Sequence, residues 1–353
     1  EAVLPDTCAT YPRHVSRVGN RLELAGSMSC PEVARRALLP EDATDLVQAP
    51  RSLLGRGQLQ QTAPDGPPGG DPRAAHVHLD EVRGTMVRLL GLDQFALTSR
   101  LFLCAFLAHK TDGLPRTAEG ALHPMPLLRH TAQMENINVL TELDRRLWQS
   151  IPSAPPPILL LLSVFRAQRR VPGGENFARL VNDVMGSYAQ EALRDGQVRT
   201  VPAAPPADGA AADDQAQVES FSPGWLSAAY GRRQGAVQGV FFRRIDRYLL
   251  NYARHFWMKD WYLQSPSLRQ HAQGLLLRIA LVRFLLLSHP DALAAAEMQP
   301  REAGEAKLDK LAVRIFYTLS RTIEHSDGFR ELMAQELERH APGVPDAIRL
   351  LAV

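Results

Sequence analysis

Apolar side chains recur every three or four positions along most of the chain, which is the spacing of one face of an α-helix. In residues 79–91 these positions are Val82, Met86 and Leu89, and acidic residues fill the first turn, where the helix dipole favours them. Further helices are predicted in residues 95–110, 134–149, 154–170, 175–193, 240–263, 268–289 and 308–337. Strand-like alternation is nearly absent, and no repeat of roughly 20–50 residues occurs. The sequence therefore predicts an all-α fold, an irregular multi-helix array.

Residues 225–262 combine aromatic and basic side chains, and they admit two interpretations. One helical face carries Phe241, Ile245, Tyr248, Tyr252 and Phe256, and a different face carries Arg243, Arg247 and Arg254. Because aromatic rings attract cations, this segment could form a pocket for a cationic sulfonium or for a lysine side chain. The alternative is an amphipathic core helix with a solvated basic face.

The chain divides into three parts. Residues 1–45 are a short cysteine-bearing segment that ends in a helix beginning at Pro31, since proline suits the first helical position. Residues 46–78 form a Gly/Pro-rich loop, and residues 79–353 form the helical domain. Within this domain we predict a disordered insertion at 201–222, because residues 201–219 have almost no large apolar side chains to bury.

Composition narrows the class of protein. The chain has 353 residues, a net charge of +2 and three cysteines, so it is not a secreted disulfide scaffold and a cytoplasmic location fits better. The small net charge gives no case for a nucleic-acid partner. No uncharged apolar run reaches the ~20 residues of a membrane span, so no membrane partner is expected. Arg278 and Arg283 interrupt the most apolar stretch of the chain, which is therefore predicted to be a buried helix. The chain begins at Glu1 rather than methionine, so we expect that an N-terminal segment is missing.

Several motifs that carry known chemistry do not occur in the sequence. There is no G-x-G-x-x-G, no P-loop, no H-E-x-x-H and no G-x-S-x-G. A cofactor site of the Rossmann type is therefore not expected, and a bound cofactor would need a helical cradle. Cys104 lies in an apolar helix and is predicted to pack in the core. Arg321 and His325 are expected to share a helix face and to point inward near Tyr252, although such pairs also occur at surfaces.

Cys8 and Cys30 lie outside the apolar runs, and a proline follows each of them closely. They could be incidental thiols, disulfide partners or metal ligands. Their separation of 22 residues is not a zinc-ribbon spacing, and two ligands do not complete a four-coordinate site. We predict that the chain turns back near Gly19–Asn20, which would bring both sulfur atoms to one place, with Arg13 near them to offset thiolate charge.

The first block of residues resembles the flagellin lysine-N-methylase family of bacteria. In that family a C-x-x-[YF]-P-R element is followed about twenty residues later by S-x-S-C-P-E. Here the matching residues are Cys8, Tyr11, Pro12, Arg13, Ser27, Ser29, Cys30, Pro31 and Glu32. The segments YLLNYARHFW and LSRTIEHSDGF also look like family segments, so the resemblance spans the chain, although only the first block is highly specific. The family's further cysteine-rich segment, of the C-x-x-x-C-C kind, has no counterpart, which agrees with an N-terminally truncated fragment.

This resemblance implies a protein lysine N-methyltransferase that transfers methyl groups from S-adenosylmethionine to lysine side chains of flagellin. It implies an iron–sulfur cluster of the 4Fe–4S type, bound by Cys8 and Cys30 together with cysteines missing here, so this fragment is expected to be inactive alone. The expected cofactor-binding residues are Tyr11, Arg13 and Arg321, and the candidates for the catalytic base are Tyr252, Glu324 and His325. The alternatives are a non-catalytic helical interaction module that binds an iron–sulfur cluster or zinc, and a helical scaffold with incidental thiols.

Overall fold

The computed structural model describes residues 11–50, 59–63, 78–115, 124–150, 158–168, 174–197, 199–200, 219–220, 222–324 and 327–340. These residues form twelve α-helices, a three-stranded sheet and a two-stranded ribbon. The predicted all-α array is therefore confirmed as the main architecture of the described part of the chain. The predicted insertion lies largely outside the described residues. At its edges, strand β4 (Arg199–Thr200) pairs with β5 (Glu219–Ser220), and Ser222 caps the next helix.

The N-terminal segment forms a small sheet that the helical pattern did not predict. Strands β1 (Arg13–Val18) and β2 (Arg21–Gly26) form an antiparallel hairpin. Its turn includes Gly19 at φ 56°, a left-handed conformation that glycine adopts without strain, so the predicted turn at Gly19–Asn20 is confirmed. Strand β3 (Leu59–Ala63) pairs in parallel with β1. The sheet thus joins the cysteine-bearing segment to part of the expected Gly/Pro-rich loop.

Helix α2 (Pro31–Leu38) begins at the predicted proline and packs against both the hairpin and the helical array. A side chain at Gly26 would overlap Val33 of α2, with a Cβ only 2.7 Å from Val33 Cγ1, so the close approach of β2 and α2 requires glycine. On the other side, the Asn251 side-chain amide donates hydrogen bonds to the carbonyl groups of Leu38 and Pro40, at 3.1 and 2.8 Å. These contacts fix the position of the N-terminal segment on the array.

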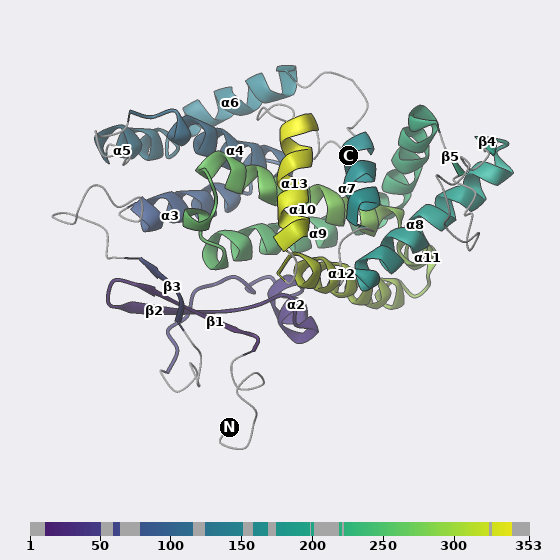
Figure 1. Cartoon of the computed structure of the whole chain (residues 1–353), viewed down its shortest axis with the longest axis horizontal. Helices are drawn as coiled ribbons and strands as arrows, with labels where there is room; N and C mark the ends of the chain where they lie inside the picture. Colours follow the sequence, from purple (N-terminus) through teal and green to yellow (C-terminus); the bar gives the residue numbers. More distant parts are fainter. Residues whose placement is uncertain are drawn as a thin grey trace, which may run out of the picture.

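The helical array follows in chain order. Its helices are α3 (Leu79–Leu90), α4 (Leu97–Asp112), α5 (Pro124–Gln133), α6 (Ile137–Ser150), α7 (Ile158–Gln168), α8 (Glu175–Arg194), α9 (Pro223–Lys259), α10 (Leu268–Ser288), α11 (Pro290–Glu297), α12 (Arg301–Glu324) and α13 (Asp327–His340). The sheet and α2 lie along one side of the array, and α5 and α6 lie along the opposite side (Figure 1).

Helix α10 is the centre of the array, where it packs against α4, α9, α12 and α13. Among the described helices it alone is long and apolar enough to cross a membrane, and 83% of its most apolar stretch is buried inside the protein. The predicted buried helix is therefore confirmed. Cys104 of α4 is also buried, as predicted, and its thiol donates to the carbonyl oxygen of Met86 at 3.6 Å. Burial raises the pKa of this thiol strongly, so Cys104 stays protonated and unreactive.

Helix α9 is the longest helix and carries the predicted apolar face. Phe241, Ile245, Tyr248, Tyr252 and Phe256 are all buried, with at most 5% of their surface exposed. Phe241 has non-helical backbone angles (φ −120°, ψ 18°), so it marks a kink in the helix. Arg301 of α12 donates a hydrogen bond to the carbonyl oxygen of Val240 at this kink. The side chain thus gives this backbone carbonyl a hydrogen-bond donor where the regular helix is interrupted.

Candidate functional site

Side chains of α9, α10, α12 and α13, with Met28 and the segment after α9, enclose a cavity of about 610 Å³. We term it the aromatic cavity, because Tyr252, Phe256 and Trp261 lie in its wall. Tyr252 and Phe256 stand four residues apart and so share a face of α9. Trp261 follows directly, because α9 ends at Lys259 and Asp260 has an extended backbone (φ −94°, ψ 106°). The end of α9 thus sets all three rings around one space.

The aromatic rings are held in place by contacts with neighbouring side chains. The ring of Tyr252 packs on Phe316 of α12, with centroids 4.9 Å apart, and Phe256 packs on the imidazole of His271 at 4.5 Å. Trp261 is 97% buried, as only 3% of its surface is exposed. Rings fixed in this way form a rigid apolar surface, which lowers the entropic cost of ordering a ligand.

A charged cluster lies in the same wall. Lys259 Nζ is 3.0 Å from Asp260 Oδ1, and Arg278 Nη1 is 3.5 Å from Asp260 Oδ2. The guanidinium group of Arg278 also lies over the ring of Phe256, 4.9 Å from its centroid. Burial alone would raise the pKa of the Asp260 carboxyl, but Lys259 and Arg278 outweigh burial and hold this pKa far below its ordinary value. Asp260 is therefore ionised throughout the physiological range.

Another part of the lining is acidic. Helix α13 contributes Glu331 and Glu338, whose side chains are exposed, to the lining of the aromatic cavity. The cavity thus has cations from α9 and α10, carboxylates from α13 and flat aromatic rings in one space. This combination suits a ligand that carries both charges and a planar or cationic centre.

Two further titratable groups of the wall, His271 and Tyr252, are neutral at physiological pH. Burial lowers the pKa of His271 to about 3. Its Nδ1 atom lies 2.9 Å from Ser265 Oγ, and its buried Nε2 atom has no hydrogen-bond partner in the described part of the chain. Burial raises the pKa of Tyr252, with Arg278 opposing this effect in part. The phenol is therefore protonated, and it can position a group but cannot accept a proton from a lysine.

The motif residues at the start of the chain gather beside this cavity. Ser27 Oγ and Ser29 Oγ are 2.6 Å apart, and the Tyr11 hydroxyl donates to Ser29 Oγ at 3.4 Å. His255 Nε2, on α9, donates to the carbonyl oxygen of Gly26 at 2.8 Å. Met28 is 98% buried and reaches the cavity wall, as 2% of its surface is exposed. The motif therefore forms part of the scaffold of the aromatic cavity.

Cys30 is the N-cap residue of α2, but its side chain makes no capping hydrogen bond and is partly exposed. Arg13 pairs with Gly26 in the β1–β2 register, and Gly26 is four residues before Cys30 in the sequence. Cys8 lies outside the described residues. In the described ranges, no group of three or more His, Cys, Asp or Glu side chains is placed to bind a metal ion. Of the two cysteines in the described residues, Cys104 is buried in the core and only Cys30 is accessible, so these residues do not make up a cluster site by themselves.

The expectation that Arg321 faces the interior is wrong. Its side chain is exposed and donates to the hydroxyl group of Tyr317 at 3.2 Å. Helix geometry gives the reason: Leu319 lies on the buried face of α12, and two residues further along a helix correspond to a rotation of about 200°. Glu324 is the last residue of α12, and His325 lies outside the described residues.

Several residues of the cavity were not singled out from the sequence, namely Lys259, Asp260, His271, Glu331 and Glu338. Arg278 was noted only as an interruption of an apolar run. That interruption was a usable signal, because a charged side chain inside a buried helix needs a partner and so points to a nearby carboxylate. The partner, Asp260, is 18 residues away on another element, and no periodicity connects the two.

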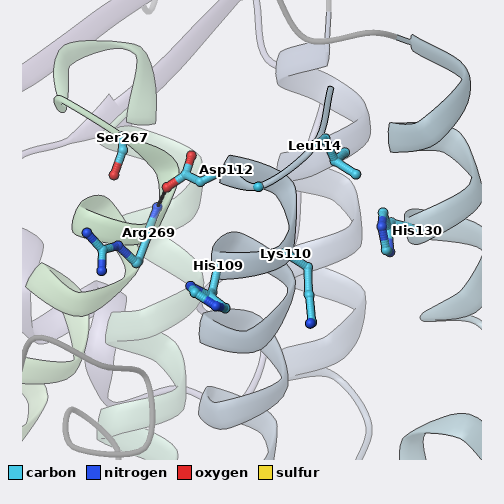
Figure 2. A pocket seen from close by; sticks show the side chains of 8 residues that line it. His109, Lys110, Asp112, Leu114, His130, Ser267 and Arg269 are labelled. Carbon is cyan, nitrogen blue, oxygen red and sulfur yellow. Dashed lines mark hydrogen bonds between the residues drawn. The ribbon is translucent and has the colours of Figure 1, made fainter. Parts of the chain in front are cut away.

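A second cavity, of about 640 Å³, lies at the end of α4. His109, Lys110 and Asp112 reach it from α4, His130 from α5 and Arg269 from α10 (Figure 2). Asp112 accepts hydrogen bonds from the backbone N–H groups of Leu268 and Arg269, at 3.2 and 2.8 Å, and so caps the start of α10. This carboxylate has a structural role, and His109 and Lys110 are exposed. The aromatic cavity is therefore the stronger candidate site.

Comparison with known proteins adds no constraint, since no family model, no curated protein and no solved structure matches the chain. The resemblance in the first block thus rests on its residues alone.

Proposed function

We propose that the chain is an S-adenosylmethionine-dependent protein lysine N-methyltransferase acting on flagellin, and that the aromatic cavity is where cofactor and lysine meet. The observation that carries this proposal is the cavity itself, with its three rings, its cationic wall and its acidic wall. The resemblance of the first block to the flagellin lysine-N-methylase family supplies the acceptor protein.

The chemistry of S-adenosylmethionine fits these walls. The cofactor carries a carboxylate, an ammonium group, a sulfonium centre and a planar adenine. Lys259 and Arg278 would hold the carboxylate, and Glu331 and Glu338 would hold the ammonium group. The faces of Phe256 and Trp261 suit adenine or the sulfonium. A volume of about 610 Å³ lies within the range of small-molecule sites.

The reaction requires a neutral amine, because only its lone pair attacks the methyl carbon. A lysine amine has a reference pKa of about 10.4, so it enters protonated at neutral pH. Transfer from water into this apolar, largely buried space disfavours the positive charge, and so lowers the pKa of the entering amine. When bound, S-adenosylmethionine would supply an electrophilic methyl group to this amine, and the electron pair of the broken S–C bond would remain on sulfur. The proton released from nitrogen passes to water.

No protein base is needed in this scheme, and the neutral groups of the wall have other roles. His271, with a pKa of about 3, is too weak a base to hold a lysine proton at neutral pH. The Tyr252 hydroxyl can donate a hydrogen bond and so orient the amine or the cofactor. Catalysis would then come mainly from positioning and desolvation.

Methylation of flagellin tests the proposal. Mass spectrometry of flagellin from cells with and without the gene should show methyl-lysine only when the gene is present. Arg278→Gln should lower methylation at least about tenfold, since it removes a charge-assisted contact to the cofactor carboxylate. Glu302→Gln, at an exposed position of α12, is the matched control and should have no effect. Flagellin that binds the protein but gains no methyl group would favour the interaction module instead.

The role of Cys30 has a separate test. Serine is a good N-cap residue, so Cys30→Ser should fold at least as stably as the wild type. The variant is tested in cells, as for flagellin methylation above: loss of bound iron and of methyl-lysine when the Cys30→Ser gene replaces the wild-type gene would support the ligand role predicted for Cys30. Cys104→Ser is the control and should retain both properties. Unchanged iron content and activity in Cys30→Ser would exclude Cys30 as a required ligand.

A further inference from the structure

The basic face of α9 lines a groove that the proposed function does not use. Arg243, Arg247 and Arg254 follow one another at steps of four and seven residues, which places them in one stripe along the helix. We term these three residues the arginine stripe. They line a groove of about 710 Å³ together with residues of α4 and of the start of α12. The stripe spans about 16 Å along the helix, since a helix rises about 1.5 Å per residue.

Other arginines in this groove already have partners. The guanidinium group of Arg244 pairs with Asp309 at 2.8 Å and with Glu305. Arg100 donates to the carbonyl oxygens of Phe95 and Leu90, at 2.8 and 3.0 Å. These two side chains are therefore part of the scaffold and are not available to a ligand.

The arginine stripe differs from them. Arg243 is exposed, and neither it nor Arg254 has a hydrogen-bonded or ion-paired partner within the described residues. Arg247 has only Glu41, whose carboxylate is 3.5 Å away and 89% exposed. The Nε groups of Arg247 and Arg254 are buried and have no acceptor in the described part of the chain. A guanidinium group offers five donors, and buried donors without an acceptor are costly, so a ligand that brings an acceptor to these two Nε groups would be favoured.

The contact with Glu41 indicates which acceptor fits. It places a carboxylate from the chain itself against the middle of the stripe, and carboxylates match the planar fork of arginine. The groove also contains Asp246 and Glu305 and the ring of Phe242, which is 57% exposed. Interspersed acids repel a continuous phosphate backbone, whereas an exposed ring favours side chains with apolar parts. These features favour a polypeptide over a nucleic acid.

We propose that the arginine stripe docks an acidic segment of a partner protein, with carboxylates that replace Glu41 at Arg247 and bind Arg243 and Arg254. This interaction is independent of the aromatic cavity, because docking requires no methyl transfer and the two sites lie on different faces of α9. It goes beyond the proposed methyl transfer and would hold for an interaction module as well.

Binding of a designed acidic peptide tests the docking site. The probe is a fluorescent twelve-residue peptide of alternating glutamate and leucine, and its affinity is measured by anisotropy at low and at physiological salt. The double variant Arg243→Glu/Arg247→Glu should lose about tenfold or more in affinity, because two attractive pairs become repulsive. Arg129→Glu, at an exposed position of α5, is the matched control and should lose less than about twofold.

A variant of opposite sign sharpens the test. Glu41→Gln removes the competing carboxylate and should raise affinity for the peptide about twofold. Thermal unfolding of each variant checks the fold, and Arg243→Gln/Arg247→Gln replaces the double charge reversal if that variant unfolds. Failure of the wild type to bind, equal losses in the stripe and control variants, tighter binding of single-stranded DNA of equal charge, or weaker binding by Glu41→Gln would each overturn the proposal. Methylation measured with Arg278→Gln is a separate readout, so failure of one proposal leaves the other intact.

Discussion

Helix α9 uses positive charge in opposite ways on its two faces. In the aromatic cavity, Lys259 is compensated by Asp260, which also pairs with Arg278 of α10. Along the arginine stripe, Arg243 and Arg254 have no such compensation among the described residues. A compensated cluster holds its own shape before any ligand arrives, whereas uncompensated charges gain most when a ligand supplies the acceptors. The two faces should therefore respond differently to substitution.

The largest effect is expected for Asp260→Asn. It leaves Lys259 and Arg278, which are only 8% and 17% exposed, without their shared carboxylate. Because Asp260 itself is 34% exposed, the expected loss in the free energy of unfolding is about 2 kcal/mol, below the cost of breaking a fully buried pair. Urea denaturation at pH 7 measures it.

The pH dependence of this loss checks its cause. The pKa of Asp260 is lower in the folded than in the unfolded state, so the stabilisation is complete above the unfolded value of about 3.8 and disappears as the pH falls through the lower folded value. The difference between wild type and Asp260→Asn should therefore shrink below about pH 4. A difference that stays constant down to pH 2 would mean that the variant acts through packing rather than charge.

A second effect concerns His271, whose folded pKa of about 3 lies below the ordinary value of 6.5. Because the unfolded state binds the proton more readily, stability should fall as the pH drops below 6.5, until the folded imidazole also titrates near pH 3. Between pH 6.5 and 5 the expected loss is about 1.5 kcal/mol. His271→Phe keeps a ring against Phe256 and should remove this slope. An identical slope in the variant would assign the pH dependence to other groups.

Arg278→Gln should lower the free energy of unfolding by about 1 kcal/mol, since it removes the contacts with Asp260 and with the ring of Phe256. The effect is smaller than that of Asp260→Asn, because Lys259 still compensates the carboxylate. Thermal or urea unfolding in parallel with Asp260→Asn measures the difference. A larger loss in Arg278→Gln than in Asp260→Asn would contradict the assignment of Asp260 as the centre of the cluster.

The smallest effect is expected in the arginine stripe. Arg247→Gln should change the free energy of unfolding by less than about 0.5 kcal/mol, because its only ion pair is long and involves an exposed carboxylate. The same holds for Arg243→Gln. A loss above about 1 kcal/mol in either variant would show that the stripe supports the fold, and the contrast between the two faces of α9 would then fail.

Most of the long helices could be predicted from the sequence because their signal is local, whereas α5, α11 and the first half of α9 were not predicted. The apolar face of α9, the burial of α10 and the burial of Cys104 each follow from the composition of one short segment. The sheet could not be predicted in this way. Strand β3 has the sequence LQQTA, with little alternation, and it becomes a strand only by pairing with β1, about 45 residues earlier. Tertiary pairing of this kind overrides a weak local preference.

The candidate site was predicted only in part, for a related reason. The sequence identified Tyr252 and the aromatic segment, because these residues recur at helical spacing. It did not identify Asp260 as the partner of Arg278, since that pair forms between two elements. It also misplaced Arg321, because the polar end of α12 was assigned inward without following the rotation of the helix past Leu319. Local periodicity gives the face of a helix, but not the element that faces it.

The route of the chain between α2 and β3 has a consequence for limited proteolysis. Residues 45–50 have no regular structure, and Leu46 and Val47 are 79% and 81% exposed, so a protease has access to this backbone. The hairpin and α2 lie before this segment and remain attached through Asn251 and His255, while β3 after it pairs with β1. A single cut should therefore give two fragments that elute together under native conditions and separate only in denaturant. The N-terminal segment behaves in this respect as a non-covalent subunit, and co-expression of the two pieces should reconstitute the whole.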